Sequence, residues 1–204
     1  MNKKITSFSV GGLLFNETIT VIDYLIAGKI NELNKVIKTT DVLKTNSEAS
    51  RLRILSEIRR RDKAVNTEVW HFIGNSVKSE QQLALFYVCL KASKLLFDFQ
   101  VEVVLEKWRT LDHIVIKNDA LYFIDKKSMD YPEMENWSDN TKEKSATVLI
   151  RILNEAGILN ENRLIQPDVS DHFWVFFIKQ GDSWFLELCL MPKNQRDKIM
   201  DIAK

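Results

Sequence analysis

Hydrophobic residues recur at helical spacing along most of this chain. The first such pattern predicts a helix over residues 13–28, which Gly28 ends. A second short helix is predicted over residues 29–39. A polar stretch then supplies the N-cap of a third helix over residues 47–63. Three short helices with a basic third one fit a helix-turn-helix arrangement.

Bulky hydrophobic residues dominate the middle of the chain. Between residues 66 and 109 they occupy nearly every face of the predicted helices, which is typical of the centre of a fold. We expect a break in these helices near Ser93. A short β-rich stretch follows at residues 114–116, and another helix is predicted over residues 118–129, ahead of Pro132.

The last third of the chain begins with a strongly amphipathic helix. Its apolar positions between residues 138 and 156 follow the i, i+3, i+4, i+7 rule, with Gly157 as its stop. Two apolar pairs around the polar tip at residues 160–162 then predict a small hairpin. A helix, a glycine and a hairpin in this order are typical of a winged helix. Helices are favoured for the remainder, residues 170–204.

The composition fits a mainly helical, all-α fold with at most a small β-wing. Only 6 glycines and 3 prolines occur among 204 residues, so few residues interrupt helices. We predict a basic helix-turn-helix-like unit at residues 1–65, central hydrophobic helices at 66–113, and a winged-helix-like and helical part at 114–204. These parts can also form one compact unit.

The chain has the character of a cytoplasmic protein. Its apolar segments are much shorter than the roughly 20 residues that span a bilayer, so no membrane contact is expected. No secretory signal is recognisable at the N-terminus. Cys89 and Cys189 lie inside apolar runs, and we interpret them as reduced core residues.

The formal net charge of +1 conceals a division of charge along the chain. Residues 1–64 carry twelve basic and seven acidic residues and therefore +5, which leaves −4 for the rest. Much of the basic charge lies in the predicted helix 47–63. Arginine suits contact with nucleic acids because its planar fork can donate two hydrogen bonds to phosphate oxygens or base edges.

A helical wheel divides helix 47–63 into an apolar and a basic side. We expect Leu52, Leu55 and Ile58 to face the core. Arg53 and Arg60 then project from the outer face, flanked by other arginines. The candidate DNA-binding residues of this region are Lys44, Arg51, Arg53, Arg59, Arg60, Arg61 and Lys63. The alternative is a solvated basic face whose arginines pair with local acidic residues.

A weaker candidate face lies on helix 138–156, opposite its apolar stripe. Its DNA-binding candidates are Thr141, Lys142, Lys144 and Arg151. Glu143 and Glu155 dilute the charge of this face, and an ordinary solvated surface is the alternative. The sequence lacks the common catalytic and metal-binding motifs: it has no P-loop, no GxGxxG, no HExxH, no GxSxG and no Cys/His metal spacing. We therefore expect a protein that is not an enzyme and needs no cofactor or metal.

Four segments of this sequence resemble one family in their order and spacing. They are GGLLFNET, SRLRILSEIRRR, QQLALFYVCLKASKLLFDF and WSDNTKEKSATVLIRILNEAGIL. The chain resembles the BrxA family, small accessory proteins of BREX phage-defence systems. This resemblance implies a non-enzymatic helical protein that binds double-stranded DNA and joins other BREX components in a complex that methylates host DNA and blocks phage replication.

The resemblance also assigns the family's basic helix to Arg51, Arg53 and Arg59–Arg61, and its later helix to the four candidates between Thr141 and Arg151. The alternation Lys142-Glu143-Lys144 departs from the more uniformly basic later helix of the family.

Two alternatives to DNA binding stay open at this point. The family is distantly similar to the antitermination factor NusB, which implies RNA as a partner. The chain can instead be a protein-interaction scaffold of the defence complex, with an aromatic C-terminal interface. That interface comprises Phe173, Trp174, Trp184 and Phe185.

Overall fold

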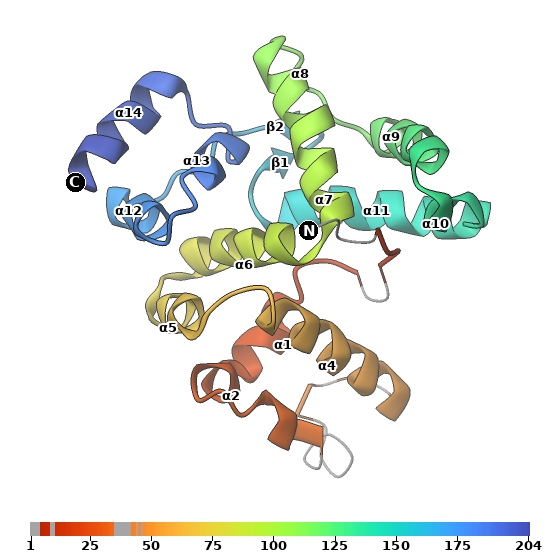
Figure 1. Ribbon diagram of the computed structural model, residues 1–204, viewed down its shortest axis with the longest axis horizontal. Coiled ribbons are helices and arrows are strands. Elements are labelled where there is room, and N and C mark those ends of the chain that lie inside the picture. Colours follow the sequence, from red (N-terminus) through yellow and green to blue (C-terminus); the bar gives the residue numbers. More distant parts are fainter. Residues whose placement is uncertain (1–4, 9–10, 35–41, 44, 46) are drawn as a thin grey trace.

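The computed structural model describes residues 5–8, 11–34, 42–43, 45 and 47–204. The described part is mainly helical, with one two-stranded sheet, which confirms the all-α class (Figure 1). The N-terminal third contains α1 (Phe15–Thr20), α2 (Ile22–Ile26), the 3-10 turn η1 (Ile30–Glu32) and α4 (Glu48–Asp62). Central elements are α5 (Thr67–Asn75), α6 (Lys78–Ala92), α7 (Lys94–Phe99), the π-helical segment η2 (Gln100–Leu105) and α8 (Glu106–Arg109).

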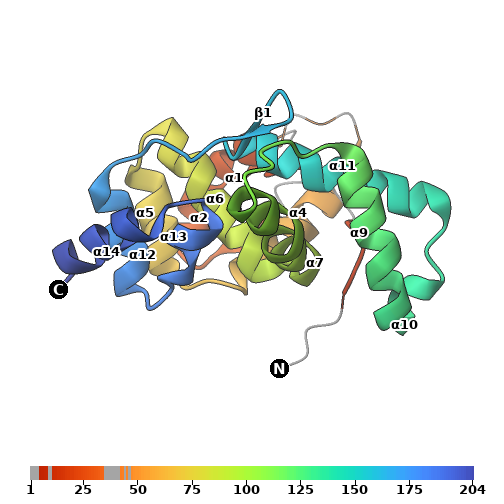
Figure 2. The same cartoon turned by 90° about the horizontal axis from the view of Figure 1, so that it is seen from above.

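The last part of the chain contributes the remaining helices and the sheet. Its elements are α9 (Lys117–Asp130), α10 (Pro132–Glu135), α11 (Asp139–Glu155), β1 (Leu159–Asn160), β2 (Arg163–Leu164), α12 (Asp171–Lys179), α13 (Trp184–Leu188) and α14 (Lys193–Ile202). In both cartoon views α9, α10 and α11 lie at one end of the molecule and α12 and α14 at the other (Figures 1 and 2).

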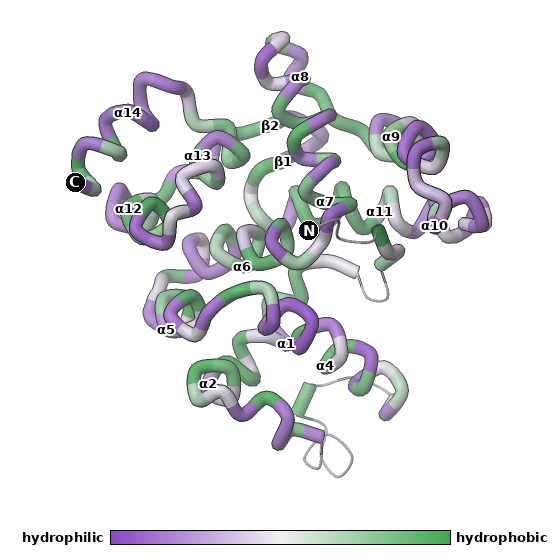
Figure 3. Tube along the Cα trace, in the orientation of Figure 1, coloured by the Kyte–Doolittle hydropathy of each residue, from purple (hydrophilic) through white to green (hydrophobic). Residues whose placement is uncertain are grey.

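Helix α6 holds these parts together. It packs against α4, α5, α7 and α11, and eight consecutive residues, from Leu83 to Leu90, are buried in it. Buried hydrophobic side chains from Ile5 to Ile199 belong to one cluster. Hydrophilic residues predominate on peripheral helices such as α10 and α14 (Figure 3). This burial of apolar surface is the main driving force for folding.

Serine caps place several helix boundaries where the sequence predicts them. Ser47, Ser138 and Ser170 each accept a hydrogen bond from a backbone N–H in the first turn of α4, α11 and α12. Ser93 has an extended backbone that ends α6, and its side chain caps α7, so the predicted break at this residue is confirmed. Gly157 follows α11 with a φ of 75°.

The prediction of one continuous helix over residues 13–28 is wrong. The structure has two helices, α1 and α2, which are separated by Val21 with φ −110° and ψ 14°. Residues 18–22 are all β-branched, and such residues lower helix propensity. Of the predicted helix 29–39, the described residues show only η1 and the start of a further turn, and residues 35–41 lie outside the described residues.

The small hairpin is confirmed in position, and the structure gives its register. Leu159 pairs with Leu164 and Asn160 with Arg163, in antiparallel fashion. Glu161 and Asn162 form the turn with positive φ angles of 47° and 65°, as a two-residue hairpin turn requires. Ile114 adds an isolated bridge to Arg163, so the predicted β-rich stretch at 114–116 contacts the hairpin.

The C-terminal aromatic segment belongs to the core, which corrects the expectation of an exposed interface there. Phe173 and Phe185 are fully buried, Trp174 is 3% exposed, and Trp184 is half-buried. Phe173, Phe177 and Phe185 contact one another through their rings. Cys89 and Cys189 are both buried and free, in agreement with their interpretation as core thiols.

Asp182 fastens the loop between α12 and α13 to α6. Its carboxylate accepts hydrogen bonds from Tyr87 at 2.5 Å, from Lys91 at 3.0 Å and from Trp184 at 2.6 Å. Burial alone would raise the pKa of this carboxyl, but these three donors hold it below its ordinary value of 3.8. The stabilisation is therefore present above about pH 4 and is lost as the pH falls through the lowered pKa.

We expect Asp182→Asn to lower the free energy of unfolding by about 1–3 kcal/mol at neutral pH, because three donors lose a charged acceptor. The difference from wild type should shrink as the pH falls below about 4. Urea denaturation at pH 7, 4 and 3 measures it. The control Asp201→Asn affects an exposed pair with Lys204 and should change stability by less than about 0.5 kcal/mol. A difference for Asp182→Asn that stays constant down to pH 3 would contradict the assignment.

Candidate nucleic-acid interface

Helix α4 carries most of the predicted DNA-binding residues. Its buried side comprises Ile54, Leu55 and Ile58 together with Glu57 and Arg61. Leu52 is 39% exposed, so the expectation that it faces the core is wrong, and Ile54 takes this place. The three consecutive arginines 59–61 lie in the last turn, where the helix dipole favours cations.

Arg61 is an interior residue and does not flank an outer face. Its side chain is 3% exposed, and Nε donates to Oε1 of Glu57 at 2.9 Å. The Nη atoms donate to the backbone oxygens of Gly12, at 2.9 Å, and Leu13. The guanidinium is buried because two carbonyls and a carboxylate satisfy it there, whereas an unpaired buried charge would be strongly unfavourable.

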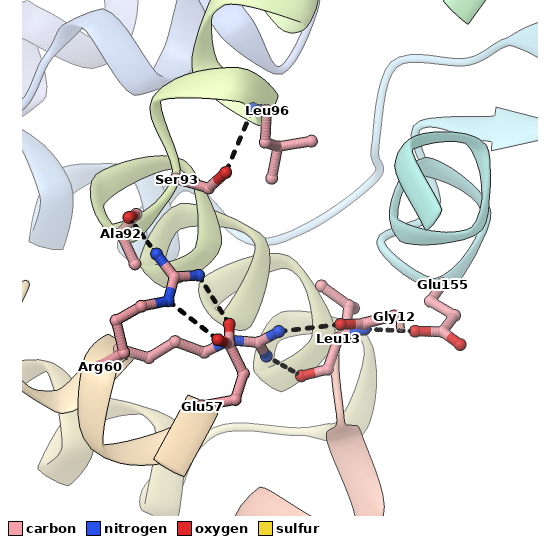
Figure 4. Close-up of polar contacts among 9 residues, drawn as sticks. Gly12, Leu13, Glu57, Arg60, Ala92, Ser93, Leu96 and Glu155 are labelled. Atoms are coloured by element: carbon pink, nitrogen blue, oxygen red, sulfur yellow. Dashed lines mark hydrogen bonds and ion pairs between the residues drawn. The ribbon is translucent and has the colours of Figure 1, made fainter. Parts of the chain in front are cut away.

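Arg60 joins the same group from the edge of the helix face. Its Nε and Nη2 donate to the two oxygens of Glu57 at 2.8 and 2.7 Å, and Nη1 donates to the backbone oxygen of Ala92 (Figure 4). Burial tends to raise the pKa of Glu57, but the hydrogen bond from Arg60 and the charge of Arg61 lower it below its ordinary value. Arg60 and Arg61 thus link α4 to α6 and to residues 12–13.

A second carboxylate continues this group toward α11. Oε2 of Glu155 accepts the backbone N–H of Leu13 at 2.5 Å, as Figure 4 shows, and Oε1 pairs with Nε of Arg151 at 2.6 Å. Arg151, a predicted DNA-binding residue, is therefore neutralised by its own helix although 61% of its side chain is exposed. We call Glu57, Arg60, Arg61, Gly12, Leu13 and Glu155 the α4–α11 polar link.

The outer face of α4, next to these contacts, carries Arg53, Arg59 and Lys63. Arg53 and Lys63 are exposed and have no ion-pair partner among the described residues. Arg59 is half-buried, and its Nη2 donates to the backbone oxygen of Ile30 at 3.4 Å. Arg51 donates to the backbone oxygen of Thr45 at 3.2 Å. Lys44 lies outside the described residues.

The second predicted face, on α11, has little free charge. Lys142 pairs with Asp125 at 2.7 Å, and the Thr141 hydroxyl lies 3.0 Å from that of Ser138 at the helix start. Lys144 is exposed and has no ion-pair partner in the described part of the chain. It lines a cavity of about 410 Å³ together with Phe8, Lys117 and Thr147.

Phe8 lines two cavities, one beside α4 and one beside α11. It lines the cavity at Lys144 and also a cavity of about 470 Å³ at the outer face of α4, which contains Arg59, Arg60 and Lys63. The structure thus brings Arg59 and Lys63 to one cavity, whereas Lys144 lines the other. Residues 6–8 and Ser93 were missed by the sequence reasoning, because only the tertiary fold brings them to α4.

The fold and this surface define a small, mainly helical protein whose basic helix keeps free cations on its outer face. No helix within the described residues combines the length and apolar character needed to cross a bilayer. The model of the BrxA family matches residues 5–181. The chain belongs to the BrxA family. It is therefore a defence-associated accessory protein.

Curated relatives and one solved structure agree with this membership. The chain is 28% identical to the "BREX protein BrxA" of Bacillus cereus (strain H3081.97), covering 86% of this chain and 90% of the relative. It is 25% identical to the protein of the same name from Escherichia coli O9:H4 (strain HS), covering 76% and 73%. An uncharacterized protein from Magnetospirillum magneticum shares the fold, with a TM-score of 0.76 and 22% identity, covering 88% of this chain and 94% of that one.

Proposed function

We propose that this protein is a non-enzymatic DNA-binding accessory protein of a BREX-type phage-defence system. It acts in the cytoplasm and contacts duplex DNA largely independently of sequence. The outer face of α4 makes the contact, in a helix-turn-helix arrangement with α1 and α2. The hairpin after α11 is the wing of a winged-helix element, and other BREX components are its protein partners.

The free cations of α4 are the observation that carries this proposal. Arg53 and Lys63 are exposed without a carboxylate partner in the described part, while Arg60 and Arg61 both pair with the buried carboxylate of Glu57. Cations that are already paired release few counterions on binding, so the unpaired ones contribute most to contact with phosphates. A surface of this kind favours contact with the phosphates of the DNA backbone over hydrogen bonds to base edges.

We expect the double variant Arg53→Glu, Lys63→Glu to lose at least tenfold in affinity for a 20-base-pair duplex. Because two phosphate contacts are removed, the slope of log affinity against log salt should become shallower by about 2. Fluorescence anisotropy at several salt concentrations measures both quantities. Arg60 is left unchanged because its substitution would also disturb the α4–α11 polar link.

The matched control reverses two exposed lysines far from α4, Lys179→Glu and Lys198→Glu, on α12 and α14. It changes the net charge equally and should leave the salt slope unchanged. Equal losses in the two double variants would show that total charge acts and would overturn the assignment of α4. Competition by a structured RNA at fixed salt tests the RNA alternative: preference for the RNA rejects duplex DNA as the ligand.

A further inference from the structure

The cavity at the outer face of α4 has a lining suited to an anion. It measures about 470 Å³ and lies between α4, residues 6–8 and Ser93 at the junction of α6 and α7. Arg59, Arg60 and Lys63 contribute positive charge, against the single carboxylate of Glu57. Both oxygens of that carboxylate already accept hydrogen bonds from Arg60 and Arg61. A surplus of positive charge therefore remains in the cavity.

Two of these cations have donors to spare. The Arg59 guanidinium donates to the Ile30 oxygen at 3.4 Å, and its Nε is buried without any hydrogen-bond partner in the described part. Burial lowers the pKa of Arg59, an effect that an anion close to the guanidinium would reverse. Lys63 has neither an ion pair nor a hydrogen bond from its side chain to a described residue. Buried polar groups without partners are rare in folded proteins.

The rest of the lining indicates what accompanies the anion. Thr6, Ser7 and Ser56 are exposed and place hydroxyl groups around the cavity, and hydroxyls donate well to phosphate oxygens. Phe8 supplies a half-buried aromatic ring, on which a base can stack. The volume lies within the range of small-molecule sites, about 300–1,000 Å³, and exceeds what a phosphate group alone requires.

We infer that this cavity binds a nucleoside monophosphate unit, whose phosphate is held by Arg59 and Lys63 and whose base lies against Phe8. The unit has two sources of the same chemistry: a free mononucleotide, or the 5′-phosphorylated nucleotide at the end of a DNA strand. Lys63 lines the cavity and also belongs to the proposed duplex contact, whereas Arg53 does not line the cavity, so Arg53 is the residue that distinguishes the two sites.

Calorimetric titration of the full chain with adenosine 5′-monophosphate, adenosine and inorganic phosphate tests the inference. We expect saturable binding of the monophosphate, at least tenfold tighter than that of adenosine or phosphate alone. The variant Arg59→Gln, Lys63→Gln should lose at least tenfold in affinity for the monophosphate. Phe8→Ala should weaken binding of the monophosphate but leave binding of inorganic phosphate unchanged. Circular dichroism melting shows whether each variant retains the fold.

Arg53→Gln is the matched control, on the same helix face but outside the cavity. This variant should bind the 20-base-pair duplex more weakly and bind the monophosphate with unchanged affinity. A failure of either proposal is therefore recognised separately. A duplex with 5′-phosphate ends that binds more tightly than one with 5′-hydroxyl ends identifies the strand end as the source, and equal binding identifies the free nucleotide. Absence of saturable monophosphate binding, or binding that Arg59→Gln, Lys63→Gln does not weaken, overturns the inference.

Discussion

Replacing Glu57 with alanine is expected to lower the free energy of unfolding by about 3–5 kcal/mol, because it leaves the buried Arg61 without its counter-ion. Arg61 is buried, and Arg60 loses two hydrogen bonds in the same variant. Urea denaturation at pH 7 measures the change. The loss should become smaller below about pH 4.5, since the lowered pKa of Glu57 means that its contribution disappears as the carboxylate becomes protonated.

The matched control is an ion pair with the same i, i+4 spacing on an exposed helix. Lys193 and Asp197 on α14 are 80% and 59% exposed, whereas Arg61 and Glu57 are 3% and 5% exposed. Asp197→Ala should therefore cost less than about 1 kcal/mol. If Glu57→Ala cost no more than this control, the α4–α11 polar link would not contribute to stability in the way its burial implies.

This link also explains which basic residues of α4 are available for binding. Reversal of Arg60 would place a carboxylate beside Glu57 and remove the contact with Ala92. A loss of DNA affinity in such a variant would then combine unfolding with a loss of charge. Substitutions of Arg53 and Lys63 avoid this difficulty, because neither side chain has an ion-pair or hydrogen-bonding partner in the described part of the chain.

Most of the fold could be predicted because its boundaries have local causes. A serine that caps its own helix, as Ser93 and Ser138 do, needs only the next three residues. The same is true of a glycine that ends a helix with positive φ, such as Gly157. The interruption at Val21 was missed because apolar spacing outweighed the β-branched run in the prediction. The π-helical segment η2 has no local signal that periodicity detects.

The candidate site could be predicted only in part. The concentration of basic residues in helix 47–63 was evident, but the rotation of the helix depends on partners far away in sequence. Arg61 turns inward because the carbonyls of Gly12 and Leu13, 49 and 48 residues away, accept hydrogen bonds from it. The spacing of Leu52 and Leu55 equally allowed a different buried face. Which arginine becomes structural is therefore decided by tertiary contacts.

Gly12→Ala is expected to destabilise the protein by roughly 2–4 kcal/mol. Gly12 has a φ of 83°, which costs an L-residue about 1–2 kcal/mol. A Cβ at this position would lie 2.6 Å from Oε2 and 2.9 Å from Oε1 of Glu155, and 3.0 Å from Nε of Arg151. The ion pair must therefore move away, and the backbone N–H of Leu13 loses its acceptor. Thermal and urea denaturation measure the change.

Gly157→Ala separates the two causes of this loss. Its φ of 75° imposes nearly the same backbone penalty, yet a Cβ there would meet no atom within 4 Å. It should cost only the conformational part, about 1–2 kcal/mol. The excess loss in Gly12→Ala then reports the contact with Glu155. It should largely vanish when Gly12→Ala is introduced into a Glu155→Ala background, because the obstructing carboxylate is already absent. An undiminished loss in that background would contradict the role of Glu155 in holding residues 12–13 against α11.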